Sequence, residues 1–117
     1  MSKNLVFSTT TELIRVPSNS VAFILADGNY SKIKMADGSE YVLTLQLGQM
    51  ETRISETIMD DNSFIRIGKS LIVNTQFITF INPARQKLVL SDCQTFRYEL
   101  SASREALKAL KEYIEKE

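Results

Sequence analysis

Short runs of apolar and β-forming residues, separated by turn residues, fill the first part of the chain. They predict strands at residues 12–16, 21–26, 30–35 and 41–45. The run at 21–26 is almost continuously apolar, as in a strand that is buried on both faces. The next run alternates, with Tyr30, Lys32 and Lys34 on one face and Ser31, Ile33 and Met35 on the other. Asp-Gly pairs at 27–28 and 37–38 favour tight hairpin turns, so the last three strands are predicted to form an antiparallel meander.

The apolar pattern changes to a helical period after residue 46. Leu47, Met50, Ile54 and Ile58 follow one another at spacings of three or four positions, which places them on one face of a helix of about three turns. The polar residues at 60–63 are predicted to end this helix. Their paired carboxylates, Asp60 and Asp61, are interpreted as part of a solvated loop, because a Mg²⁺ or Ca²⁺ site draws oxygen ligands from several spaced positions.

Strand patterns return in the second half and give way to a final helix. Short β segments are predicted at 64–67, 71–73, 77–81, 87–90 and 96–100. Residues 103–117 are predicted to form a helix with one apolar face, capped by the hydroxyl of Ser101 or Ser103; the face consists of Ala106, Leu107, Leu110, Tyr113 and Ile114. The pattern therefore predicts a mostly β protein with two helices, the second at the C-terminus.

The composition indicates one globular domain. At 117 residues with 44% hydrophobic and 24% charged residues, the chain can bury a core and is too apolar for a disordered segment. It has no apolar run of the ~18 residues that a transmembrane helix needs and no signal-peptide core of about 7 to 15 residues. We therefore expect a cytoplasmic protein that does not insert into a membrane. The single cysteine, Cys93, is interpreted as an incidental thiol.

The residue types argue against an enzyme and against a bound metal or cofactor. The chain has no histidine, which excludes Ser-His-Asp and Cys-His catalysis and most zinc sites. Its four glycines stand singly, so neither a P-loop nor a dinucleotide fingerprint is present. The Ser-Lys neighbours at 31–32 and 69–70 do not indicate a catalytic pair, because neighbouring side chains of a strand point to opposite faces.

One segment, residues 64–74, combines an apolar frame with a polar insert. The insert consists of Arg66, Lys69, Ser70 and Asn74. Arg66 and Lys69 are suited to phosphate or base edges, Ser70 to a phosphate, and Asn74 to fixing a turn through backbone hydrogen bonds. The alternative is a solvated hairpin whose charges keep it soluble. Net charge does not decide between the two, because 14 basic residues balance 14 acidic ones.

The same segment resembles the signature of LytTR DNA-binding domains, Phe-x-Arg-x-His-Arg-Ser followed two residues later by Val-Asn and then by an isoleucine. Phe64, Arg66, Ser70, Val73, Asn74 and Ile78 match. Gly28-Asn29-Tyr30, the helix at Leu47 and the closing Ser103-Arg104 extend the resemblance over most of the chain. It implies a single domain at 1–117 with a core at about 12–116, built of stacked antiparallel sheets with flanking helices. No span resembles a receiver domain.

The resemblance also implies a function. Such a domain is a bacterial transcription regulator, related to response regulators, whose loops enter successive major grooves of double-stranded DNA at promoter repeats. Carried over, the base-reading loops fall at 29–31, 68–70 and 103–104. The expected base contacts are Tyr30, Lys69 and Arg104, and the expected phosphate contacts are Asn29, Ser31, Lys32, Arg66, Ser70 and Lys87. Tyr30 is equally suited to packing or stacking, and Arg104 to capping the last helix or to an ion pair.

One departure from the signature leaves a second function open. Gly68-Lys69 replaces the His-Arg pair, and lysine lacks the planar two-pronged donor that arginine presents to guanine. This puts base reading by that loop in doubt. Together with the zero net charge, it is compatible with a protein-interaction module that has kept the fold and lost DNA binding. The resemblance leaves open a homodimer on DNA and a regulatory protein partner.

Overall fold

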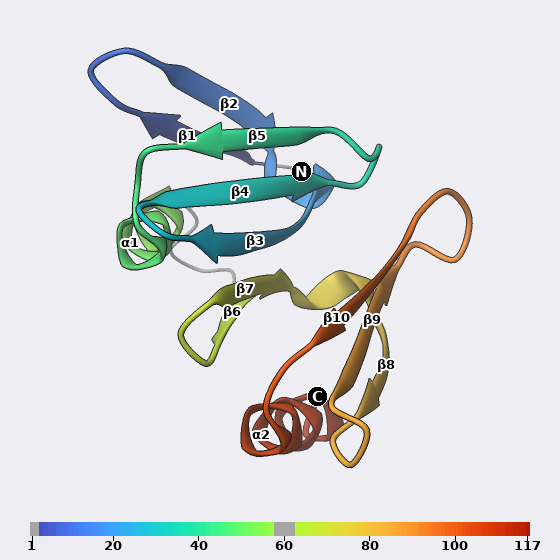
Figure 1. The fold of residues 1–117 in the computed structure, drawn as a ribbon. Helices are drawn as coiled ribbons and strands as arrows, with labels where there is room; N and C mark the ends of the chain where they lie inside the picture. The colour runs from blue at the N-terminus through green and yellow to red at the C-terminus, as the bar shows by residue number, and fades with distance from the viewer. Residues whose placement is uncertain (1–2, 58–62) are drawn as a thin grey trace.

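A computed structural model describes residues 3–57 and 63–117 of the chain (Figure 1). The first half contains β1 (Asn4–Ser8), β2 (Leu13–Pro17), a 3-10 turn (Ser18–Ser20), β3 (Val21–Asp27), β4 (Tyr30–Met35), β5 (Glu40–Leu43) and α1 (Leu47–Thr57). The second half contains β6 (Phe64–Ile67), β7 (Leu71–Asn74), a 3-10 turn (Thr75–Phe77), β8 (Ile78–Asn82), β9 (Lys87–Ser91), β10 (Arg97–Ser101) and α2 (Arg104–Glu115). The predicted end of the first helix, at Ile58 and the acidic pair after it, lies outside the described residues.

The described strands form three antiparallel sheets. The largest has the order β5-β4-β3-β7-β6, the second has the order β10-β9-β8, and β1 pairs with β2. In Figure 1 the five-stranded sheet lies between the β1-β2 hairpin with α1 and the three-stranded sheet with α2. The predicted meander of three strands is confirmed as β3, β4 and β5.

Strand β3 lies at the centre of the large sheet and contributes to two separate cores. Val21 and Ile24 belong to the first core, which the β1-β2 hairpin and α1 cover. Ala22 and Phe23 belong to the second core, which includes residues of β9 and α2. The predicted burial of this strand on both faces is confirmed. Strand β3 therefore contributes side chains to the core beneath α1 and to the core beneath α2.

Strand β1 was not predicted. Leu5 and Phe7 are fully buried in the first core, whereas Val6 between them is 38% exposed. The three consecutive apolar residues hide this alternation in the sequence. The packed part of the domain thus begins before residue 12.

The final helix agrees with its predicted cap. Ser103 precedes α2 in an extended conformation, and its hydroxyl accepts a 3.1 Å hydrogen bond from the backbone N–H of Ala106. This bond satisfies one of the backbone donors that a helix leaves unpaired at its N-terminus. Leu107 and Leu110 of the predicted apolar face are buried. No helix in residues 3–57 and 63–117 has the length and apolar character needed to cross a membrane.

Candidate nucleic-acid interface

The turn between β3 and β4 and the turn between β6 and β7 lie next to each other. Because β3 and β7 are antiparallel and Leu25 pairs with Leu71, β3 ends where β7 begins. The backbone N–H of Ala26 donates a 2.8 Å hydrogen bond to the carbonyl oxygen of Ser70. Both turns lie on the left side of Figure 1. Residues 29–31 and 68–70, which are far apart in the sequence, therefore meet at one edge of the sheet.

The segment that leads into α2 joins the same edge. A cavity of about 250 Å³ has Gly68, Lys69 and Ser70 on one side and Ser101 and Ser103 on the other. All three loops expected at the DNA are thus contiguous. The segment 28–31, the turn at 68–70 and the segment 101–104 are called the three-loop edge below.

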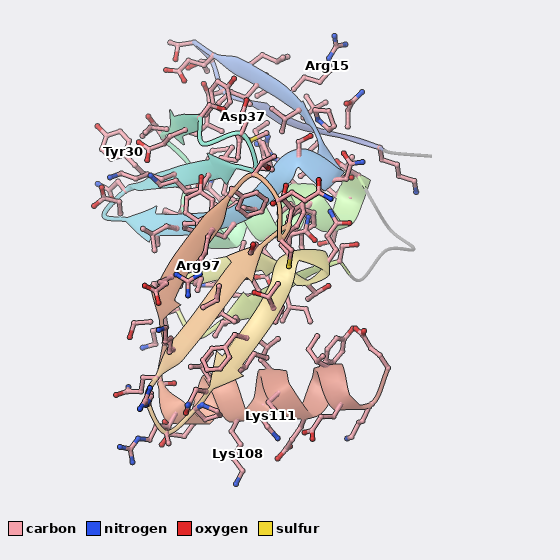
Figure 2. The ribbon with its side chains drawn as sticks, turned by 90° about the vertical axis from the view of Figure 1, so that its right-hand side faces the viewer. Arg15, Tyr30, Asp37, Arg97, Lys108 and Lys111 are labelled. Carbon is pink, nitrogen blue, oxygen red and sulfur yellow. The ribbon has the colours of Figure 1, made fainter. Side chains whose placement is uncertain are left out.

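The residues expected at base edges are accessible on the three-loop edge. The side chain of Tyr30 is 50% exposed and points outward from the start of β4 (Figure 2). Lys69 and Arg104 are exposed, and within residues 3–57 and 63–117 neither forms an ion pair with a carboxylate. Their charges are therefore available to a ligand. Asn29 and Ser70 are exposed beside them.

The other cations expected at phosphates already have carboxylate partners. Lys32 lies 3.3 Å from Asp27, Arg66 lies 3.2 Å from Glu51, and Lys87 lies 2.6 Å from Glu99. The ammonium of Lys87, and then the guanidinium of Arg97, hold the pKa of the Glu99 carboxyl below its ordinary value. Ion pairs at a solvent-accessible surface are weak, so a phosphate can compete for Lys32 and Lys87.

Ser31 corrects an expectation. Its side chain is fully buried, and its hydroxyl donates a 2.7 Å hydrogen bond to the carbonyl oxygen of Leu45. The hydroxyl is therefore unavailable to a phosphate, and the expected contact is wrong. Instead, the bond ties the start of β4 to the chain that enters α1.

Asn74 fixes backbone at the end of β7 that lies away from the three-loop edge. Its side-chain oxygen accepts a 3.2 Å hydrogen bond from the N–H of Gln76, at the start of the following 3-10 turn. Its amide group donates at 2.9 Å to the carbonyl oxygen of Val21. The side chain is buried and joins β7 to the beginning of β3.

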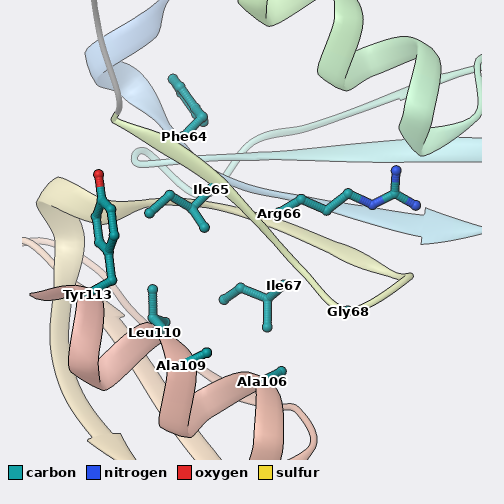
Figure 3. Close-up of a pocket in the computed structure, with 9 residues that line it drawn as sticks. All are labelled: Phe64, Ile65, Arg66, Ile67, Gly68, Ala106, Ala109, Leu110 and Tyr113. Carbon is teal, nitrogen blue, oxygen red and sulfur yellow. The ribbon is translucent and has the colours of Figure 1, made fainter.

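A groove of about 570 Å³ separates β6 from α2 (Figure 3). Ile65 and Ile67 point into it from the strand, and Ala106, Ala109, Leu110 and Tyr113 line the helix side. The Ala106 end lies near Gly68 and the Tyr113 end near Phe64. The sequence showed the apolar helix face but gave no sign that two alanines would leave space beside an edge strand.

Glu51 is a further residue of this region that the sequence did not single out. It belongs to the polar face of α1, and its carboxylate bonds to Arg66 of β6. Fifteen positions separate the two residues, and the packing of α1 against the five-stranded sheet brings them together. No local pattern marks such a partner.

Comparisons with known proteins agree with this architecture. The family model described as the LytTr DNA-binding domain matches residues 11–115. Among solved structures, a LytTr DNA-binding domain from Bacillus cereus is similar, with a TM-score of 0.63, 21% sequence identity and 96% of each chain covered. A likeness at this identity shows the fold, and it confirms the predicted mostly β architecture with two helices and stacked antiparallel sheets. The search of curated proteins found no match.

Proposed function

The chain belongs to the family of LytTr DNA-binding domains, and from this we propose that it regulates transcription by binding promoter DNA through the three-loop edge. The observation that carries the proposal is the contiguity of the three loops, which the hydrogen bond from Ala26 to Ser70 and the shared cavity beside Ser103 support. Contiguous loops can face the same duplex together and reach the major groove, where each base pair presents a distinct set of donors and acceptors. A regulator of this kind acts in the cytoplasm.

We assign separate roles to two groups of side chains. Tyr30, Lys69 and Arg104 contact base edges, because they are accessible and the two cations have no carboxylate partner among the described residues. Asn29, Lys32, Ser70 and Lys87 contact phosphates and set the register on the duplex. Lys87 pairs across the strands with Ser101, which places it beside the third loop.

Selection of bound duplexes from random DNA tests the proposal. We expect one sequence to be enriched, and we expect its affinity to fall steeply with added salt, with a slope of about −0.9 for each phosphate neutralised. Two copies of a half-site in the enriched duplexes would indicate a homodimer. Absence of an enriched sequence, or binding that salt does not change, would contradict the proposal. The Lys69→Ala and Arg104→Ala double variant should lose the preference for the enriched sequence.

One observation favours a second function, a protein-interaction module on the same fold. Three of the expected phosphate-binding cations are paired with carboxylates, and the net charge is zero, so attraction to DNA is weaker than in a basic domain. Random selection also separates the two functions, because an interaction module would enrich no duplex.

A further inference from the structure

The guanidinium group of Arg66 bonds to two different elements at once. Its Nη1 lies 3.2 Å from the Oε1 of Glu51 on α1, and its Nη2 donates a 3.2 Å hydrogen bond to the carbonyl oxygen of Lys69. Figure 3 shows the side chain leaving β6 on the side opposite the groove. One side chain therefore links helix α1 to the backbone of the turn that carries Lys69.

Two more hydrogen bonds attach this link to the rest of the three-loop edge. The carbonyl oxygen of Ser70 accepts from the N–H of Ala26, so the turn is also held by β3. The hydroxyl of Ser31 donates to the carbonyl oxygen of Leu45, which holds the approach to α1 against β4. Hydrogen bonds thus connect α1, the turn that carries Lys69 and strands β3 and β4 to one another.

We propose that Glu51 and Arg66 are a positioning pair that fixes the backbone at Lys69 for DNA recognition, and that Arg66 does not itself bind a phosphate. The inference rests on the proposed function. Its physical basis is the shape of the guanidinium, whose planar fork can meet a carboxylate and a carbonyl oxygen in two directions at once, which a lysine ammonium does not reproduce. Holding one side chain and its turn in place contributes about 0.5 to 1.5 kcal/mol to binding, which is roughly a twofold to twelvefold change in affinity.

The test compares Glu51→Gln and Arg66→Lys with the wild type on the selected duplex and on unrelated DNA at several salt concentrations. We expect each variant to lose about twofold to twelvefold in affinity for the selected duplex, with unchanged affinity for unrelated DNA and an unchanged salt slope. Glu40→Gln is the matched control, because it removes the carboxylate partner of Lys34 at the other end of the β4-β5 hairpin. Stronger binding of Glu51→Gln to all DNA would overturn the inference, since it would show that a released Arg66 contacts phosphate.

A second measurement needs no DNA. Backbone amide order parameters from nuclear magnetic resonance should fall at residues 68–70 in Glu51→Gln and stay unchanged in Glu40→Gln. Unchanged order at that turn in Glu51→Gln would overturn the inference, whatever the DNA results. If the wild type selects no duplex, the proposed function fails, whereas the order parameters still decide whether the pair positions the turn.

Discussion

The hydroxyl of Tyr98 donates a 2.9 Å hydrogen bond to the backbone carbonyl oxygen of Met35, and this bond joins the three-stranded sheet to the five-stranded one. The ring of Tyr98 also packs edge-on against Phe23 of β3, with centroids 5.1 Å apart. Strand β10 carries Tyr98 and leads directly into the segment 101–104. The position of the third loop relative to the other two therefore depends on this contact between the sheets.

Removing the Tyr98 hydroxyl should cost stability. We expect Tyr98→Phe to lower the free energy of unfolding by about 0.5 to 1.5 kcal/mol, the usual contribution of one hydrogen bond, while the ring contact with Phe23 is kept. Urea denaturation followed by circular dichroism measures the change. Tyr113→Phe is the control, because Tyr113 is 41% exposed and its hydroxyl has no hydrogen-bond partner in the described part of the chain. Equal losses in the two variants would contradict the role of the inter-sheet bond.

Two glycines should respond in opposite ways to alanine. Gly68 has a φ of +62° and open space where a Cβ atom would stand, so Gly68→Ala should cost about 1 to 2 kcal/mol from backbone strain alone. Gly48 lies in the first turn of α1, where an added carbon would meet Arg66 at an ordinary distance of 3.7 Å. Gly48→Ala should therefore stabilise the protein by roughly 0.5 to 1 kcal/mol.

Thermal and urea unfolding of both variants test whether Gly68→Ala lowers and Gly48→Ala raises the stability. The wild type is the common reference, and the two changes add the same methyl group. A Gly68→Ala variant as stable as Gly48→Ala would show that the turn at 68–70 relaxes away from its left-handed conformation.

Patterns of apolar residues predicted most of the fold because burial leaves a periodic trace. The continuous run at 21–26 indicated the central strand, and Leu47, Met50 and Ile54 are buried as their spacing required. Strand β1 was missed because the apolar Val6, between Leu5 and Phe7, hides their alternation with exposed positions. Ser31 was misassigned although the signal was present: it shares a strand face with Ile33 and Met35, which point into the first core.

The candidate site was predictable only as far as its turns. Glycine at position 68 and the Ser103 cap mark local backbone geometry, and local geometry is what a sequence pattern records. Partners across the fold leave no such mark. Asp27, Glu51 and Glu99 form ion pairs with the three cations that were expected at phosphates. These ion pairs are apparent only in the folded structure.

Acid should weaken the β9-β10 hairpin through Asp92. The Thr95 hydroxyl and backbone N–H, followed by the N–H groups of Gln94 and Phe96, hold the pKa of Asp92 far below its ordinary value of 3.8. A carboxyl with a depressed folded-state pKa stabilises the fold fully above its unfolded pKa and loses that contribution as the pH falls toward the folded value. Asp92→Asn should thus lower the melting temperature at neutral pH.

The difference between wild type and Asp92→Asn should begin to shrink below about pH 3.8, where the unfolded carboxyl takes up its proton. Melting temperatures recorded by circular dichroism from pH 7 to pH 2 measure it. Glu12→Gln is a suitable control, since Glu12 is exposed and forms no ion pair within the described residues. A constant difference across the whole pH range would contradict the role of the Asp92 charge.

Arg104 and Lys32 should affect DNA binding in different ways, because we assign Arg104 to a base edge and Lys32 to a phosphate, and of the two only Lys32 has a carboxylate partner among the described residues. Arg104→Ala should cost about 1 to 3 kcal/mol on the selected duplex and relax the preference at about one base pair, as expected for a base contact. Lys32→Ala should weaken binding to every duplex alike, with a small effect because Asp27, at 3.3 Å, already neutralises this cation.

Equilibrium binding to the selected duplex and to its single-base variants, at several salt concentrations, separates the two roles. Lys116→Ala at the far end of α2 removes the same charge as Lys32→Ala from outside the three-loop edge and should change neither affinity nor preference. A variant that lacks a base contact loses affinity only for duplexes that carry the base pair in question. A variant that lacks a phosphate contact loses affinity for every duplex, and its salt slope is smaller by about one. Equal loss on every duplex for Arg104→Ala and Lys32→Ala would therefore refute the assignment of Arg104 to a base edge.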